Sequence, residues 1–456
     1  HDQLGERQVP ADRYYGIQTL RAIENFNITG IPISHYPRLV SSLAYIKKAA
    51  ALANEELGLL EHPLADAISR ACDELLAGKL LDEFVVDVIQ GGAGTSTNMN
   101  ANEVIANRAL ELLGHNKGEY EILHPLNHVN MSQSTNDVYP TALRITLSQK
   151  LDGLMEEMIH LRDAFGRKAE EFADVIKMGR TQLQDAVPMT LGQEFGAWAL
   201  MVTEDIQRVQ EAQSLIREIN MGATAIGTGL NAHPDYARLV TEKLRQLTGI
   251  PVVSSENLVE ATQDTGAYVQ LSGVLKRVAT KLSKICNDLR LLNSGPRAGF
   301  GEIRLPPMQA GSSIMPGKVN PVIPEVVNQI AFQVIGNDLT ITLAAEAGQL
   351  QLNVMEPVIA DCIIESQTMF MNAASTLRVH CIDGITANQD VCREYIERSI
   401  GVVTALNPVL GYDVTTELAK EALATNRGIV ELVREKKLLS EEEIAAVMDP
   451  ARMIGT

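Results

Sequence analysis

The sequence contains few aromatic residues. Phenylalanine, tryptophan and tyrosine together make up 4% of its 456 residues, whereas apolar residues of all kinds make up 45%. A core built from this composition is mainly aliphatic, which is more typical of helix bundles than of β-sandwiches. The length corresponds to about three domains of average size.

Positive charge is also scarce. The chain carries 39 lysines and arginines against 57 aspartates and glutamates, which gives a formal net charge of −18. Proteins that bind nucleic acid need a basic surface to neutralise the phosphates, so we expect no nucleic-acid partner. An anionic ligand would have to be held by local cations and N–H donors against the overall field of the protein.

Cysteine is infrequent, and the cysteines show no C-x-x-C pairing. The five cysteines are Cys72, Cys286, Cys362, Cys381 and Cys392. Such scattered thiols predict a reducing compartment rather than a disulfide framework or a zinc site. The sequence also has neither a secretory signal pattern nor an apolar run of about 18 residues, so we expect a cytoplasmic protein without a membrane partner.

Helical periodicity dominates the middle of the sequence. Apolar residues recur at alternating spacings of three and four in segments 147–165, 191–209 and 268–292. Such a regular repeat predicts long helices that pack at shallow angles in a left-handed bundle. Pro188 suits the first position of a helix, and we therefore expect the second helix to begin there.

Segment 325–352 differs because it is apolar on most faces. A helix of this kind in a protein without membrane spans is expected to be buried on every side. One subunit cannot easily bury several such helices, so we infer a homo-oligomer whose core they form.

The remaining sequence predicts shorter helices on both sides of this central region. We expect an N-terminal domain at residues 1–135, a central helix-bundle domain at 136–390 and a small C-terminal helical domain at 391–456. Strand patterns are rare, and residues 8–15 are the segment in which we expect a small hairpin. Ser440, followed by three glutamates, resembles a capping box at the start of a helix.

Four polar loops are rich in hydroxyl and amide side chains, and each precedes a helical pattern. These loops span residues 90–100, 130–137, 179–185 and 311–320. Helix N-termini with such loops bind anions readily, because the helix dipole and the free N–H groups favour negative charge. Together with Lys318 in the fourth loop, they predict a pocket for a small polyanion.

Other interpretations of these motifs are less favoured. A single Ser/Thr/Asn loop is usually only a helix cap. Residues 91–96 superficially resemble a phosphate loop but lack its Gly-Lys-Ser/Thr ending. His124 and His128 have a spacing that suits a metal ion, but no third ligand accompanies them, so we predict no metal site.

The fourth loop reads Gly-Ser-Ser-Ile-Met-Pro-Gly-Lys-Val-Asn and resembles the signature of the fumarase/aspartase superfamily; we call residues 311–320 the signature loop. The resemblance extends over nearly the whole chain, including the loops with Thr95, Ser134 and Thr181. It implies an all-α subunit of three domains with a long central five-helix bundle. It also implies a homotetramer with a twenty-helix core, in which each active site takes loops from three subunits.

Within this superfamily the chain resembles the aspartases more than the fumarases. Fumarases typically have Gln-Thr-Gly-Ser-Gly-Thr where residues 90–95 read Gln-Gly-Gly-Ala-Gly-Thr. They typically carry serine in place of Thr135 and histidine in place of Gln182. Segments 322–329 and 351–357 also look like those of aspartases.

The resemblance to aspartases implies the reversible conversion of L-aspartate to fumarate and ammonia by a carbon–nitrogen lyase. The Cβ proton lies next to a carboxylate, and its removal gives an enediolate, which fixed donors can stabilise. The family assigns the role of general base to Ser312. N–H groups, a helix N-terminus and Lys318 would favour the alkoxide form of this serine. The chemistry needs no cofactor, although Mg²⁺ activates some aspartases at a separate site.

The resemblance also assigns substrate contacts. It implies that the β-carboxylate is bound by Thr95, Ser134, Thr135 and Ser313. It implies that the α-carboxylate is bound by Thr181, Lys318 and Asn320. Asn136, with Thr95 and Gln182, would lie beside the amino group.

Three alternative functions stay open on the sequence alone. The nearest is a fumarate hydratase on the same scaffold. A second is a non-catalytic structural oligomer, because lens crystallins have been recruited from this superfamily. A third is a nucleotide-linked lyase that cleaves a succinyl group, although no nucleobase contacts are recognisable in the sequence.

Overall fold

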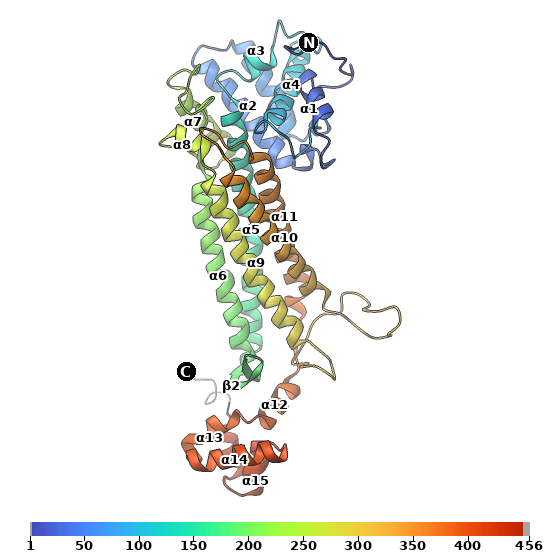
Figure 1. Cartoon of the computed structure of the whole chain (residues 1–456), viewed down its shortest axis with the longest axis vertical. Helices are drawn as coiled ribbons and strands as arrows, with labels where there is room; N and C mark the ends of the chain where they lie inside the picture. Colours follow the sequence, from blue (N-terminus) through green and yellow to red (C-terminus); the bar gives the residue numbers. More distant parts are fainter. Residues whose placement is uncertain (1, 450–456) are drawn as a thin grey trace. The chain divides into compact units, whose positions relative to one another are not determined.

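The fold is almost entirely helical (Figure 1), in a computed structural model that describes residues 2–449. The all-α class predicted from the sequence is confirmed, because strands occur only as three short two-stranded sheets in the described residues. In the same part of the chain, no helix is both long enough and apolar enough to span a membrane.

The chain divides into two compact units. Unit 1 contains the described residues of His1–Met155, Gln207–Arg277 and Gln333–Met369. Unit 2 contains those of Glu156–Ile206, Val278–Phe332 and Phe370–Thr456.

Five long helices each contribute one part to unit 1 and the other part to unit 2. They are α5 (Thr135–Glu171), α6 (Leu191–Ile216), α9 (Gly266–Leu292), α10 (Val322–Glu346) and α11 (Glu356–His380).

The apolar stripes predicted from the sequence form the inner faces of three of these helices. Every stripe position in α5, α6 and α9 is buried. In unit 2, Phe195 of α6 packs against Phe165 of α5, with 6.2 Å between ring centroids. In unit 1, Asp338 of α10 accepts hydrogen bonds from Ser272 (2.8 Å) and Lys276 (2.6 Å) of α9. The periodicity therefore predicted these helices correctly.

Shorter elements complete unit 1. They are α1 (Ile17–Asn25), η1 (Ile33–His35), α2 (Pro37–Glu56), α3 (His62–Leu76), η2 (Leu81–Glu83), α4 (Thr95–Leu112), a π-helical turn η3 (Pro125–Val129), β3 (Glu218–Ile219), α7 (Tyr236–Thr248), β4 (Val253–Ser254) and α8 (Leu258–Gln263). Helices α2 and α3 carry proline in their first turn, which suits positions where no N–H donor is needed. Their alanine-rich faces form a continuous core with α4 and α7.

Unit 2 adds one hairpin and the C-terminal helices. Its elements are β1 (Ile176–Thr181), β2 (Gln184–Thr190), β5 (Ile303–Arg304), η4 (Ile382–Gly384), β6 (Thr386–Ala387), α12 (Gln389–Arg398), α13 (Val402–Leu410), α14 (Tyr412–Thr425), α15 (Ile429–Glu435) and α16 (Glu441–Val447). The capping box predicted at Ser440 is confirmed, since its side chain accepts from Glu443 N while the Glu443 side chain binds Ser440 N.

Two local predictions are wrong. Pro188 does not open a helix; it lies in β2 opposite Met178, and α6 begins at Leu191. A two-stranded ribbon has only edge strands, which tolerate the missing N–H of proline. Residues 8–15 form no strand, because Arg13 N instead donates to Pro10 O in a turn.

Helix α10 is not buried on every side within one chain. Phe332, Leu339 and Leu343 are each more than 60% exposed, whereas Val327 and Ala331 are buried. The apolar residues thus cover an inward face and an outward face of the same helix.

Candidate active site

In unit 1, the structure brings together the starts of α4 and α5. Thr95 is the first residue of α4, and Thr135 is the first residue of α5. Gly94 precedes Thr95 with φ of +89° and lies directly against the Tyr139 ring in the first turns of α5. A Cβ at Gly94 would come within 2.2 Å of that ring, so only glycine permits this approach.

Substitution of Gly94 by alanine is expected to destabilise the protein by about 1–3 kcal/mol, because it combines an unfavourable φ with overlap on Tyr139. Gly91→Ala is the matched control, since a Cβ there would meet only Phe26 atoms at 3.6 Å. Chemical unfolding of both variants checks this expectation, and equal stability of the two would contradict it.

A buried lysine supports the same region. Lys47 of α2 is fully buried, and its Nζ donates to Asn98 Oδ1 (2.6 Å), Asn130 Oδ1 (2.9 Å) and Gln133 Oε1 (2.9 Å). Burial lowers the pKa of Lys47 to about 7, whereas three amide acceptors match the three N–H bonds of its ammonium form. Asn98 Nδ2 in turn donates to Thr135 Oγ1 at 3.1 Å, so Lys47 orients Thr135 through Asn98.

A buried carboxylate fixes the loop that precedes α5. Asp137 accepts hydrogen bonds from the backbone N–H groups of Ser134 (3.0 Å), Gly222 (3.2 Å) and Thr224 (2.9 Å). Burial raises the pKa of Asp137 to about 7, and these N–H donors act in the opposite direction. Asn136 Nδ2 donates to Ala225 O at 2.7 Å, so residues 134–137 are tied to the segment that follows α6.

In unit 2, Thr181 and Gln182 lie at the tip of the β1–β2 hairpin. Gln182 and Leu183 form its two-residue turn with φ of +56° and +62°, and Thr181 pairs with Gln184. The sequence predicted only a polar loop before a helix here. The hairpin presents Thr181 and Gln182 to solvent.

The signature loop lies between β5 and α10, also in unit 2. Gly311 N donates to Lys318 O (2.7 Å), and Asn320 Nδ2 donates to Gly311 O (3.0 Å), so these contacts close the base of the loop. Ser312 Oγ accepts from the N–H groups of Ile314 (3.2 Å) and Met315 (3.3 Å). Two N–H donors on one hydroxyl oxygen favour its negatively charged form.

The ten site residues predicted from the sequence therefore form two sets. Unit 1 carries Thr95, Ser134, Thr135 and Asn136, and unit 2 carries Thr181, Gln182, Ser312, Ser313, Lys318 and Asn320. The contacts given above are those within each set.

Sequence reasoning missed the supporting roles of Lys47 and Asp137. A signal for Lys47 was available, because it lies one turn from Leu43 and Ala51 on the apolar face of α2. The two histidines of the π-helical turn act as caps: His124 Nδ1 accepts from Leu126 N and Asn127 N, and His128 Nδ1 accepts from His124 N.

Comparison with known proteins extends these observations to the whole chain. Residues 5–336 match the family described as Lyase, and residues 402–455 match the family described as Fumarase C C-terminus. The aspartate ammonia-lyases of Pseudomonas aeruginosa and Helicobacter pylori are 61% and 60% identical over 455 residues. These alignments cover 100% of this chain and 96% and 97% of the relatives.

Solved structures show the same relationship. A fumarate lyase:delta crystallin from Brucella melitensis bound to cobalt superposes with a TM-score of 0.98 at 55% identity, covering 100% of this chain and 99% of that one. A class II fumarase from Schistosoma mansoni superposes with a TM-score of 0.92 at 36% identity, covering 99% and 98%. From these full-length matches it follows that the chain belongs to the aspartate ammonia-lyases, carbon–nitrogen lyases of the fumarase/aspartase superfamily.

Proposed function

We propose that this protein catalyses the reversible deamination of L-aspartate to fumarate and ammonia, in the cytoplasm. The observation that carries the proposal is the identity of 60–61% to aspartate ammonia-lyases over the full chain, against 36% to the fumarase. The differences from fumarases at Thr135 and Gln182 support the same choice.

Ser312 is the proposed general base. It removes the Cβ proton of aspartate, and the resulting enediolate then expels the amine. A serine hydroxyl is a weak base at neutral pH, and the two N–H donors on Ser312 Oγ support its alkoxide form. Gly311 and Gly317 are proposed as hinges for movement of the loop over the substrate, which would exclude water and strengthen these interactions.

Fixed donors are proposed to hold the two carboxylates of the substrate and to stabilise the charge that develops on the β-carboxylate. Thr95, Ser134, Thr135 and Ser313 are proposed for the β-carboxylate, where the enediolate charge accumulates. Thr181, Lys318 and Asn320 are proposed for the α-carboxylate. Asn136, Thr95 and Gln182 are proposed beside the amino group.

The proposed assembly is a homotetramer in which each active site takes loops from three subunits. The outward apolar face of α10, with Phe332, Leu339 and Leu343, supports association with copies of the same chain. A single chain leaves this face exposed, and burial of apolar area drives association.

The test of the activity is a paired assay with L-aspartate and L-malate. We expect ultraviolet absorbance of fumarate to rise with aspartate, with release of ammonia, and to stay near background with malate. Rapid turnover of malate would favour a fumarate hydratase. Inactivity toward both dicarboxylates, in a folded oligomer, would favour a structural protein.

A further inference from the structure

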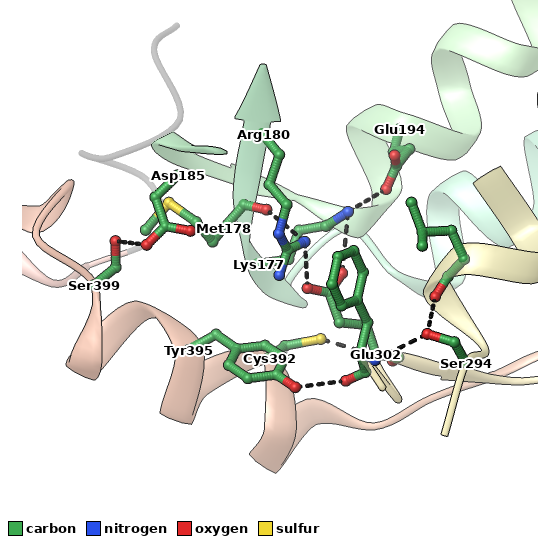
Figure 2. A network of polar contacts seen from close by, with 12 residues as sticks. Lys177, Met178, Arg180, Asp185, Glu194, Ser294, Glu302, Cys392, Tyr395 and Ser399 are labelled. Atoms are coloured by element: carbon green, nitrogen blue, oxygen red, sulfur yellow. Dashed lines mark hydrogen bonds and ion pairs between the residues drawn. The ribbon is translucent and has the colours of Figure 1, made fainter. Parts of the chain in front are cut away.

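A fully buried carboxylate lies at the centre of an ion-pair cluster in unit 2. Glu302 has no exposed surface, and its Oε1 lies 2.6 Å from Arg180 Nη1 while its Oε2 lies 3.1 Å from Lys177 Nζ. Figure 2 shows both cations reaching Glu302 from strand β1. Both carboxylate oxygens therefore form ion pairs with cations of β1.

The cluster is balanced in charge. Lys177 Nζ also lies 2.6 Å from Glu194 Oε2 of α6, so two cations face two carboxylates. Burial acts to lower the pKa of Lys177, but Glu194 and Glu302 outweigh it and raise that pKa. Removal of the Glu302 charge would leave Arg180 without a carboxylate partner inside the cluster, whereas Lys177 would keep Glu194.

Two aromatic rings also lie beside the guanidinium of Arg180. Its guanidinium lies 4.3 Å from the centroid of the Phe300 ring and 5.7 Å from that of Tyr395 on α12. Tyr395 Oη donates to the backbone O of Phe300 at 2.9 Å, so the two aromatic residues are linked to each other. Cation–π contacts with both rings restrict the movement of the planar cation.

The backbone of Glu302 is anchored independently of its side chain. Its N–H donates to Leu292 O at 2.9 Å, and its C=O accepts from Asn388 N at 2.8 Å. The carboxylate is therefore presented from a fixed point between the end of α9 and the start of α12.

The position of Arg180 matters because Thr181 and the turn follow it directly. Gln182 and Leu183 adopt positive φ although neither is glycine, a conformation that residues with a Cβ adopt only when the surroundings impose it. The strand is irregular between Met178 and Arg180, so regular pairing alone does not fix the tip. Contacts at Arg180 on one strand, and at Asp185 with Ser399 Oγ (2.7 Å) on the other, lie directly beneath the turn.

We propose that Glu302 is a positioning residue for Thr181 and Gln182, acting through Arg180 to hold the hairpin turn in its substrate-binding conformation. The proposal rests on the proposed function, in which Thr181 binds the α-carboxylate of aspartate. Glu302 does not touch the substrate; it determines where Thr181 lies.

A double-mutant cycle between Glu302→Gln and Thr181→Ala separates positioning from general stabilisation. Glu302→Gln keeps the shape of the side chain and removes its charge. We expect it to raise the KM for aspartate about tenfold with a much smaller change in kcat, because binding of the carboxylate is lost. The kcat/KM of the double variant should lie within about threefold of that of the less active single variant, because both substitutions act on the same contact.

Glu194→Gln is the matched control, because it removes a carboxylate from Lys177 and leaves the Arg180–Glu302 pair in place. Its effect on kcat/KM should combine additively with that of Thr181→Ala. Additive effects for Glu302→Gln, or an unchanged KM in that folded variant, would overturn the proposal.

Arg180→Lys covers the case in which Glu302→Gln does not fold. It keeps a cation beside Glu302 but loses the planar group that contacts Phe300 and Tyr395, and we again expect a raised KM. A normal KM in Arg180→Lys would count against the proposal.

Hydrogen exchange of the backbone amides of residues 181–184 provides a readout that does not depend on activity. Faster exchange there in Glu302→Gln or Arg180→Lys, but not in Glu194→Gln, supports the positioning role even if the wild-type protein fails to deaminate aspartate. Unchanged exchange in both variants would overturn the role, whereas an inactive wild-type protein would overturn the proposed function alone.

Discussion

Replacement of Ser312 by alanine is expected to lower the turnover of L-aspartate by roughly 10³-fold or more while the oligomer stays intact. The substitution removes only the hydroxyl group. The N–H groups of Ile314 and Met315 donate to this hydroxyl, and both residues are exposed. Water can therefore take the place of Ser312 Oγ as the acceptor for these N–H groups. Stability should change little.

The kinetic signature identifies the role of this hydroxyl. Loss of the base should lower kcat strongly and affect the KM for aspartate much less, because the carboxylate contacts remain. Exchange of the Cβ proton of aspartate with solvent deuterium should fall in parallel with kcat, since both need the same proton abstraction.

Ser313→Ala is the neighbouring comparison. In the proposed mechanism it loses one donor to the β-carboxylate but keeps the base, so its turnover should fall less than that of Ser312→Ala. A Ser312→Ala enzyme with turnover within about tenfold of the wild type would reject the assignment, because general-base catalysis contributes at least about 10²-fold. Equal losses in the two variants would instead place the serines in a common binding role.

The helices were predictable because their signal is local and repeats along the chain. The apolar stripe of residues 268–292 returns every three or four positions and has no polar interruption on that face. Burial of such a stripe stabilises a helix whatever its neighbours are, so α9 begins and ends close to the predicted segment.

The β1–β2 hairpin was not predictable in the same way. Gln182 and Leu183 lack the Asn-Gly or Asp-Gly chemistry that normally marks a two-residue turn. Tertiary contacts at Arg180 and Asp185 lie directly beneath this turn, and its local sequence favours other conformations. Pro188 also favoured the start of a helix over a strand.

The candidate site also contains residues that local sequence predicts and residues that it does not. Loop residues such as Thr95 and Ser312 were recognisable because hydroxyls and glycines gather at helix N-termini and in the signature loop. Lys47 and Glu302 were missed because the sequence around a single charged residue reveals nothing about its distant partners. Their roles depend on residues distant in sequence, such as Asn130 for Lys47 and Arg180 for Glu302.

Replacement of Lys47 by methionine is expected to destabilise the protein by about 2 kcal/mol or more and to lower kcat/KM for aspartate. Methionine has a similar length and no N–H donors. The oxygens of Asn98, Asn130 and Gln133 would each lose a donor. Asn130 Oδ1 would keep the hydrogen bond from Asn98 Nδ2, whereas Asn98 Oδ1 and Gln133 Oε1 would be left unsatisfied. An unsatisfied acceptor away from water costs about 1–3 kcal/mol. Asn98 would then lose the contact that fixes its amide oxygen, and its Nδ2 would be held less firmly toward Thr135 Oγ1.

Lys48→Met is the control, because the adjacent lysine forms an ion pair with Asp73, whose side chain is 54% exposed. Exposed pairs of this kind contribute about 0–1 kcal/mol, so stability and activity should stay near those of the wild type. Chemical unfolding and aspartate kinetics on both variants provide the measurement.

The two readouts distinguish packing from orientation of the site. If Lys47 only fills space, methionine, which has a similar length, should substitute for it with little change in either quantity. If Lys47 orients Asn98 and Thr135, activity should fall even under conditions where the variant is fully folded. Wild-type kcat/KM in folded Lys47→Met would therefore remove Lys47 from the site.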